Sequence, residues 1–154
     1  PEPDRTEPLA TPGQEPNWQP ISALARVAAV IDGQLAAVKD QHRMLVTAAG
    51  RPYSLDNATV ERVVRVFGET AEGLWLYDEQ LRRWANRRLT ESQRTEVERL
   101  GAQVDILRDV VGEVLSLATR LKGQTIEALL AKSDLELGIE GLLGGEAGWG
   151  AGRP

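Results

Sequence analysis

The chain has 154 residues, of which 42% are hydrophobic, 27% charged and only 5% aromatic, a composition that suits one domain of packed helices with an aliphatic core. Cysteine is absent, which excludes disulfides, thiol nucleophiles and thiolate metal sites. The net charge of −5 is the sum of −3 over residues 1–20 (one base, four acids), +1 over 21–123 (fifteen bases, fourteen acids) and −3 over 124–154 (two bases, five acids). The body of the protein, residues 21–123, therefore lacks the excess of basic residues that is typical of proteins that bind a phosphate backbone.

Residues 1–20 hold six of the eight prolines and few apolar side chains. Such a segment cannot bury enough surface to offset the entropy of ordering it, which predicts a disordered tail or linker. Trp18 is the exception, because its large side chain could dock on the folded body.

The first helical pattern starts at Ser22, a candidate N-cap, and ends at the breaker formed by Gly50, Arg51 and Pro52. Apolar residues at alternating steps of four and three predict one buried stripe. Its members are Leu24, Ala28, Ile31, Leu35, Val38, His42 and Leu45. For His42 two interpretations stay open, a pH-sensitive contact or a partly buried histidine bonded to a neighbour.

Two heptad patterns follow. The second pattern begins near Asp56, and its seam comprises Val60, Val63, Phe67, Thr70, Leu74, Tyr77, Leu81 and Trp84. The third begins at Thr90, which with Gln93 matches a capping box. Its seam comprises Val97, Leu100, Val104, Leu107, Val111, Val114, Ala118 and Leu121.

The link near Leu89 is so short that the second and third helices should form an antiparallel hairpin. The alternative is one continuous helix, because neither Gly nor Pro interrupts residues 74–100. We predict an all-α, elongated antiparallel bundle of three long helices, with a coiled-coil-like hairpin. Its core should be thick at the open end, with the first helix laid across it, and thin at the turn.

After Gly123 we predict one or two short helices, of which Leu135, Ile139, Leu142 and Leu143 should cap the open end of the bundle. The predicted boundaries are a tail over 1–20, the bundle over 21–143 and a Gly-rich flexible tail over 144–154.

Catalytic signatures are missing: the chain has no phosphate-loop, HExxH or GxSxG motif, and its one histidine cannot supply a di-iron site. Asp105, Asp109 and Glu113 step by four along one helix, but Arg108 and Arg120 lie close, which is typical of a solvated face. We therefore predict no enzyme, no cofactor, no metal and no small-molecule ligand.

Two tryptophans and four arginines lie near the predicted turn. Trp75 and Leu76 fall off the seam beside Arg82 and Arg83, which predicts a partner interface, unless the first helix covers them within the chain. Arg82, Arg83, Arg87 and Arg88 could instead bind phosphate, although cations are favoured at a helix C-terminus anyway.

The leading hypothesis is a non-enzymatic interaction or scaffold protein that self-associates through its heptad faces, with a protein partner or a second copy. The alternative is an accessory nucleic-acid-binding protein that uses the arginine-rich tip. Charge-free stretches reach only about ten residues, short of the roughly twenty that a membrane-spanning helix needs, so we expect a cytoplasmic protein without membrane contact.

Overall fold

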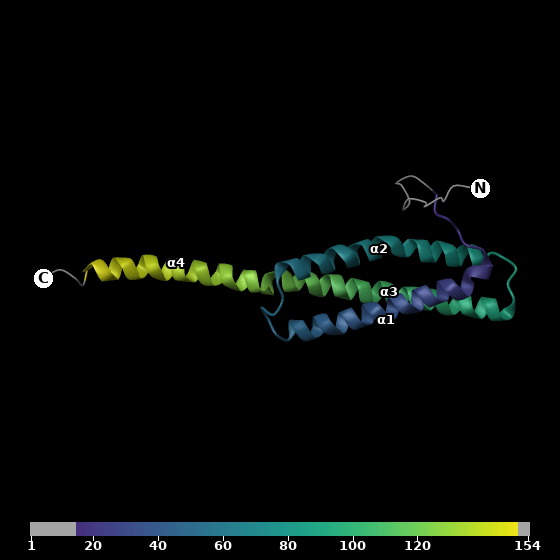
Figure 1. Ribbon diagram of the computed structural model, residues 1–154, viewed down its shortest axis with the longest axis horizontal. Coiled ribbons are helices and arrows are strands. Elements are labelled where there is room, and N and C mark those ends of the chain that lie inside the picture. Colours follow the sequence, from purple (N-terminus) through teal and green to yellow (C-terminus); the bar gives the residue numbers. More distant parts are fainter. Residues whose placement is uncertain (1–14, 151–154) are drawn as a thin grey trace, which may run out of the picture.

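A computed structural model describes residues 15–150, without the side chains of residues 140 and 143–150. It contains a 3-10 turn η1 (Ile21–Ala23), α1 (Leu24–Ala49), α2 (Asn57–Ala85), α3 (Glu91–Leu121), a second 3-10 turn η2 (Lys122–Gln124) and α4 (Ile126–Gly150). Helices α1, α2 and α3 lie side by side, whereas α4 runs away from them along the long axis (Figure 1). The predicted all-α bundle is confirmed. Of the predicted tails over 1–20 and 144–154, residues 1–14 and 151–154 lie outside the described residues.

The chain turns back between α2 and α3, so the hairpin is confirmed and the single continuous helix is wrong. Thr90 forms the predicted capping box: its hydroxyl accepts from the Gln93 N–H at 3.1 Å, and the Gln93 side chain accepts from the Thr90 N–H at 2.9 Å. These bonds satisfy amide groups that a helix start leaves unpaired. Asp56 caps α2 by accepting from the Thr59 N–H at 2.8 Å. The predicted N-cap at Ser22 is wrong, because α1 follows η1 and starts at Leu24 without a side-chain cap.

The heptad seams form the core. All eight predicted seam residues of α3 are buried, and in α2 the series Val60, Phe67, Leu74 and Leu81 is buried as well. Both α1 and α2 pack closely against α3, which is therefore the central helix. The polar seam member Thr70 donates its hydroxyl to its own helix, at the Val66 carbonyl 3.0 Å away.

The core is larger at the open end than at the turn end, as predicted: between residues 82 and 99 only Trp84 and Val97 are buried. Helix α1 begins beside the turn and covers the hairpin along its whole length (Figure 1). Its residues Ala28 and Ile31 pack with Leu81, Trp84 and α3 in one buried cluster. Trp84 is 1% exposed and is the largest fully buried side chain of this cluster.

By length and composition alone, one helical stretch of the described chain, Ile21–Ala49, could cross a membrane, because an 18-residue window within it has a mean hydropathy of 1.5. Counting charge-free residues missed this stretch, because Arg26 and Asp32 interrupt it. In the structure its apolar stripe faces α3, and Asp32 accepts hydrogen bonds from Arg99 at 2.8 and 3.0 Å. Only 28% of the apolar window is buried inside the bundle, so packing against α3 accounts for part of its apolar composition.

The loop between α1 and α2 holds the start of α4. Its Tyr53 N–H donates to the Gln124 carbonyl at 2.7 Å, and the Ile126 N–H donates to the Leu55 carbonyl at 2.8 Å. Leu55 and Thr125 thereby form an isolated parallel bridge, and Thr125 is fully buried. Thr125 also accepts from the Ala128 N–H at 3.1 Å, which caps α4. We call residues 53–55 and 124–126 the joint.

The C-terminal region differs from the prediction in length and direction. It is one helix of 25 residues that continues past the predicted boundary at 143, and it does not fold back over the bundle. The predicted cap of the open end is therefore wrong: Leu135 is 67% exposed, Ile139 49% and Leu142 76%, while the side chain of Leu143 lies outside the description. The joint prevents the return, because it directs α4 outward from its first turn.

Candidate interaction surfaces

The predicted interface residues on α2 remain partly at the surface. Trp75 is 53% exposed and Leu76 is 37% exposed, so α1 does not cover them as the alternative required. Instead the extended segment 15–20, which we call the strap, reaches this face of α2. The Trp18 ring meets the Trp75 ring edge to face, with 6.3 Å between centroids. Trp18 thus docks on the body, as expected for the one large side chain of its segment.

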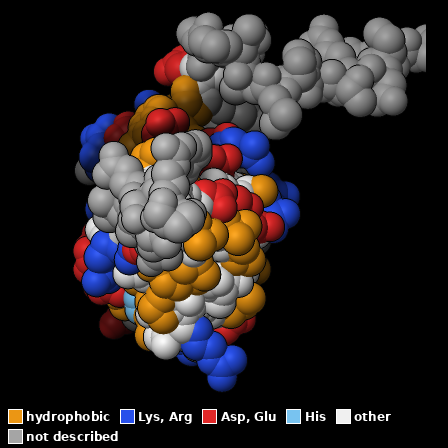
Figure 2. Space-filling view, turned by 90° about the vertical axis from the view of Figure 1, so that its left-hand side faces the viewer, with side chains coloured by type: hydrophobic (Ala, Val, Ile, Leu, Met, Phe, Trp, Pro, Cys, Tyr) orange, Lys and Arg blue, Asp and Glu red, His pale blue; other side chains and the backbone are white. Residues whose placement is uncertain are grey.

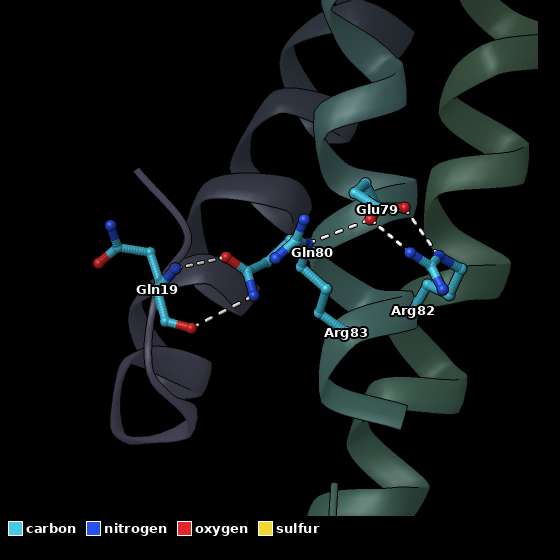
Figure 3. A network of polar contacts seen from close by, with 5 residues as sticks. All are labelled: Gln19, Glu79, Gln80, Arg82 and Arg83. Carbon is cyan, nitrogen blue, oxygen red and sulfur yellow. Dashed lines mark hydrogen bonds and ion pairs between the residues drawn. The ribbon is translucent and has the colours of Figure 1, made fainter. Parts of the chain in front are cut away.

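The strap is held by its main chain. The Gln80 side chain accepts from the Gln19 N–H at 2.7 Å and donates to the Gln19 carbonyl at 3.3 Å (Figure 3). The indole N–H of Trp84 donates to the same carbonyl at 2.9 Å. Gln80 is buried, and a buried amide without partners would be costly, so these bonds explain why a polar side chain is tolerated there.

Two of the predicted arginines are held by one carboxylate. Arg82 binds Glu79 through two nitrogens, at 2.5 and 2.7 Å, and Arg83 binds it at 3.1 Å (Figure 3). The guanidinium of Arg83 also lies over the Trp18 ring, 4.4 Å from its centroid, in a cation–π contact. The hydrogen bond from Arg82, with help from Arg83, lowers the pKa of Glu79 from 4.5 to about 2. This carboxylate therefore keeps Arg82 and Arg83 on the α2 surface at neutral pH.

We expect the Glu79 carboxyl to titrate near pH 2 in the native protein. Because the pKa of Glu79 is lower in the native than in the unfolded protein, the ionised carboxylate stabilises the fold. This stabilisation is complete above the unfolded pKa of 4.5 and is lost as the pH falls toward 2. Arg82→Gln removes the main cause and should move the midpoint back toward 4.5. Carboxyl chemical shifts followed by NMR measure this, with Arg88→Gln as the control that leaves the midpoint unchanged. An unshifted midpoint in Arg82→Gln would contradict the assigned cause.

The four arginines proposed for nucleic acid divide into two pairs. Arg82 and Arg83 are engaged with Glu79, whereas Arg87 and Arg88 lie exposed in the turn, and neither forms an ion pair within the described part of the chain. Only two of the four cations are thus free of a carboxylate, which reduces the positive field available to a phosphate backbone.

The other candidate polar groups form ordinary surface contacts. His42 lies 3.1 Å from the Glu113 carboxylate with 30% of its side chain exposed, so it is a partly buried histidine with a neighbouring carboxylate. In the carboxylate row of α3, Asp105 binds Arg108 at 2.9 Å, and Arg108 also binds Asp78 of α2. Within the described residues no group of three or more His, Asp or Glu side chains could hold a metal ion.

Helix α4 carries half of the large hydrophobic side chains that are exposed in the described chain. Seven of its aliphatic side chains are 38–76% exposed: Ile126, Leu129, Leu130, Leu135, Leu137, Ile139 and Leu142. At 3.6 residues per turn, Leu130 and Leu137 share one side of the helix, and Leu135, Ile139 and Leu142 share the opposite side. Figure 2 shows hydrophobic side chains gathered at this end of the molecule, with acidic ones beside them.

The sequence analysis did not predict that the aliphatic side chains of α4 are exposed, nor that Gln80 and Trp84 bind the backbone of the strap. The signal for α4 was present, because aliphatic residues occupy both of its sides over 126–142, but the prediction assigned them to the bundle. The strap left no such signal, because Gln19 and Gln80 are 61 residues apart and form no pattern.

We found no matching protein-family model, no matching curated protein and no matching solved structure for this chain.

Proposed function

We propose that this chain is a non-enzymatic interaction or scaffold protein that self-associates. The observation that carries the proposal is α4, a helix whose large aliphatic side chains are exposed along two opposite sides. Soluble chains rarely leave such a surface uncovered, and contiguous exposed apolar patches mark interaction sites. All eight heptad residues of α3 and five of the eight of α2 are buried within the chain, so the proposal places self-association on α4.

A second copy of α4 is a suitable occupant for this surface. Its aliphatic side chains recur at seven-residue steps, as in Leu130 with Leu137 and Leu135 with Leu142, which allows paired helices to interlock. The bundle then serves as a rigid body carried by the associating helix.

Charge distinguishes self-association from docking on another protein. Residues 126–150 carry five acids and one lysine, a net −4, so two copies of α4 repel each other electrostatically. Salt screens this repulsion, and self-association should therefore strengthen as ionic strength rises. A basic partner would show the opposite dependence.

We expect multi-angle light scattering of the wild type to give a mass that rises with concentration to a dimer or larger assembly. Changing Leu135, Leu137, Ile139 and Leu142 together to Gln should give a monomer, because Gln keeps helix propensity but removes apolar contact. The matched control changes four exposed hydrophobic residues of the bundle, Val30, Met44, Val46 and Val66, to Gln and should associate like the wild type. A wild-type monomer at the highest concentration reached, in low and high salt, would refute self-association.

A nucleic-acid role finds support only in the exposure of Arg87 and Arg88. This role is the less favoured proposal, because the body is nearly neutral and because Arg82 and Arg83 are paired with Glu79.

A further inference from the structure

We infer that the strap occupies a peptide-binding site on α2, formed by Trp75, Gln80, Arg83 and Trp84. The site takes an extended peptide with a tryptophan two residues before a proline, and the chain fills it with its own residues 17–20. This inference does not depend on self-association through α4.

Recognition of Gln19 is directed at its backbone. Gln80 pairs with both the N–H and the carbonyl of Gln19, and Trp84 donates to that carbonyl. The side chain of Gln19 takes no part in this recognition: its carbonyl oxygen accepts from Arg26 at 2.9 Å, and its amide donates to the Asn17 carbonyl at 3.0 Å. A primary amide that bonds to both main-chain groups of one residue does not depend on the side chain of that residue. It can therefore hold an extended segment with many different side chains at that position.

The neighbouring positions supply selectivity. Trp18 enters a site bounded by the Trp75 ring and the Arg83 guanidinium, which together favour a large aromatic side chain. Its indole N–H is buried and has no hydrogen-bond partner in the described structure, so the site recognises the ring rather than this donor. Pro20 adopts φ −68° and ψ 160°, the extended conformation that proline fixes in advance.

The strap competes with any added peptide because it is tethered. Pro20 is directly followed by η1, and its carbonyl accepts from the Ala23 N–H at 2.9 Å. A ligand joined by so short a connection has a high effective concentration, on the order of millimolar or above. A peptide in solution should therefore bind weakly to the wild type and much more tightly once the strap is disengaged.

The test uses the full chain and a fluorescein-labelled peptide with the sequence EPNWQPI, residues 15–21, followed by fluorescence anisotropy. In the chain, Trp18→Ala with Gln19→Pro removes the aromatic contact and the N–H that Gln80 accepts. We expect saturable binding to this double variant, at least ten times tighter than to the wild type. Adding Trp75→Ala to the double variant should abolish it, as should alanine in place of tryptophan in the peptide. Gln19→Ala, which keeps all three hydrogen bonds to the backbone of residue 19, should behave like the wild type.

A double variant that melts cooperatively but binds no more peptide than the wild type would overturn the inference. Binding that survives Trp75→Ala or the alanine peptide would overturn it as well. If the double variant does not melt cooperatively, Trp18→Ala alone provides the same comparison, with tighter binding than the wild type expected and equal or weaker binding overturning the inference.

Discussion

Replacing Leu107 with aspartate should abolish cooperative folding of the chain. Leu107 is fully buried on the central helix, in the same cluster as Leu35 of α1 and Leu74 of α2. A carboxylate there would have to be buried without a partner or protonated, and either costs several kcal/mol. Because the total stability of a domain this size is about 5–15 kcal/mol, the loss is comparable with the whole. Thermal and urea unfolding followed by far-UV circular dichroism measure it.

The adjacent residue provides the control for this experiment. Ile106 is 41% exposed, so Ile106→Asp leaves its charge in water and should keep a cooperative transition near that of the wild type. Equal effects of the two substitutions would show that the register of α3 is different from the one described, because a helix turns by about 100° between neighbouring residues.

The second large effect is expected at Trp84. Trp84→Ala should lower the free energy of unfolding by about 3–5 kcal/mol, the usual loss for a large aromatic side chain removed from a core. Trp84 is 1% exposed at the turn end and also donates its indole N–H to the Gln19 carbonyl, so the substitution should loosen the strap too. Denaturant unfolding gives the change in free energy.

Trp75→Ala is the matched comparison on the same helix. Trp75 is 53% exposed and meets the Trp18 ring edge to face, so its loss should cost less than about 1.5 kcal/mol. A larger loss at Trp75 than at Trp84 would contradict the described burial of the two residues.

Most of the bundle could be predicted from the sequence because its determinants are local and periodic. The seven-residue recurrence from Val60 to Leu81 and from Val97 to Leu121 places the buried faces. Thr90 with Gln93 marks the break between α2 and α3 even though neither Gly nor Pro stands there, since a capping box satisfies the first amides of a new helix. The hairpin then follows from the shortness of the turn.

The path of the chain after Leu121 could not be predicted in the same way. Apolar residues on a short segment normally indicate burial, and this reasoning assigned Leu135, Ile139 and Leu142 to the core. The direction of α4 depends instead on hydrogen bonds between Tyr53 and Gln124 and between Leu55 and Ile126, which join parts of the chain about 70 residues apart. No periodic pattern reports such contacts.

The candidate site on α2 was predicted in part. The exposure of Trp75 and Leu76 off the seam follows from helical periodicity, and the structure agrees. The pairing of Arg82 and Arg83 with Glu79 is also local, at separations of three and four residues. The docking of Trp18 required knowledge of which face α1 leaves open, and that is decided only when all three helices have assembled.

The joint makes α4 a spacer of defined length. Glu127 accepts from the Asn57 N–H at 2.9 Å, so the first turn of α4 and the first turn of α2 are fixed to each other. A helix of 25 residues is about 37 Å long. The rotation of α4 about its own axis is fixed at the point where it leaves the bundle. A molecule bound to the far part of α4 would therefore hold the bundle at a fixed distance from itself and in a fixed rotation about the axis of α4.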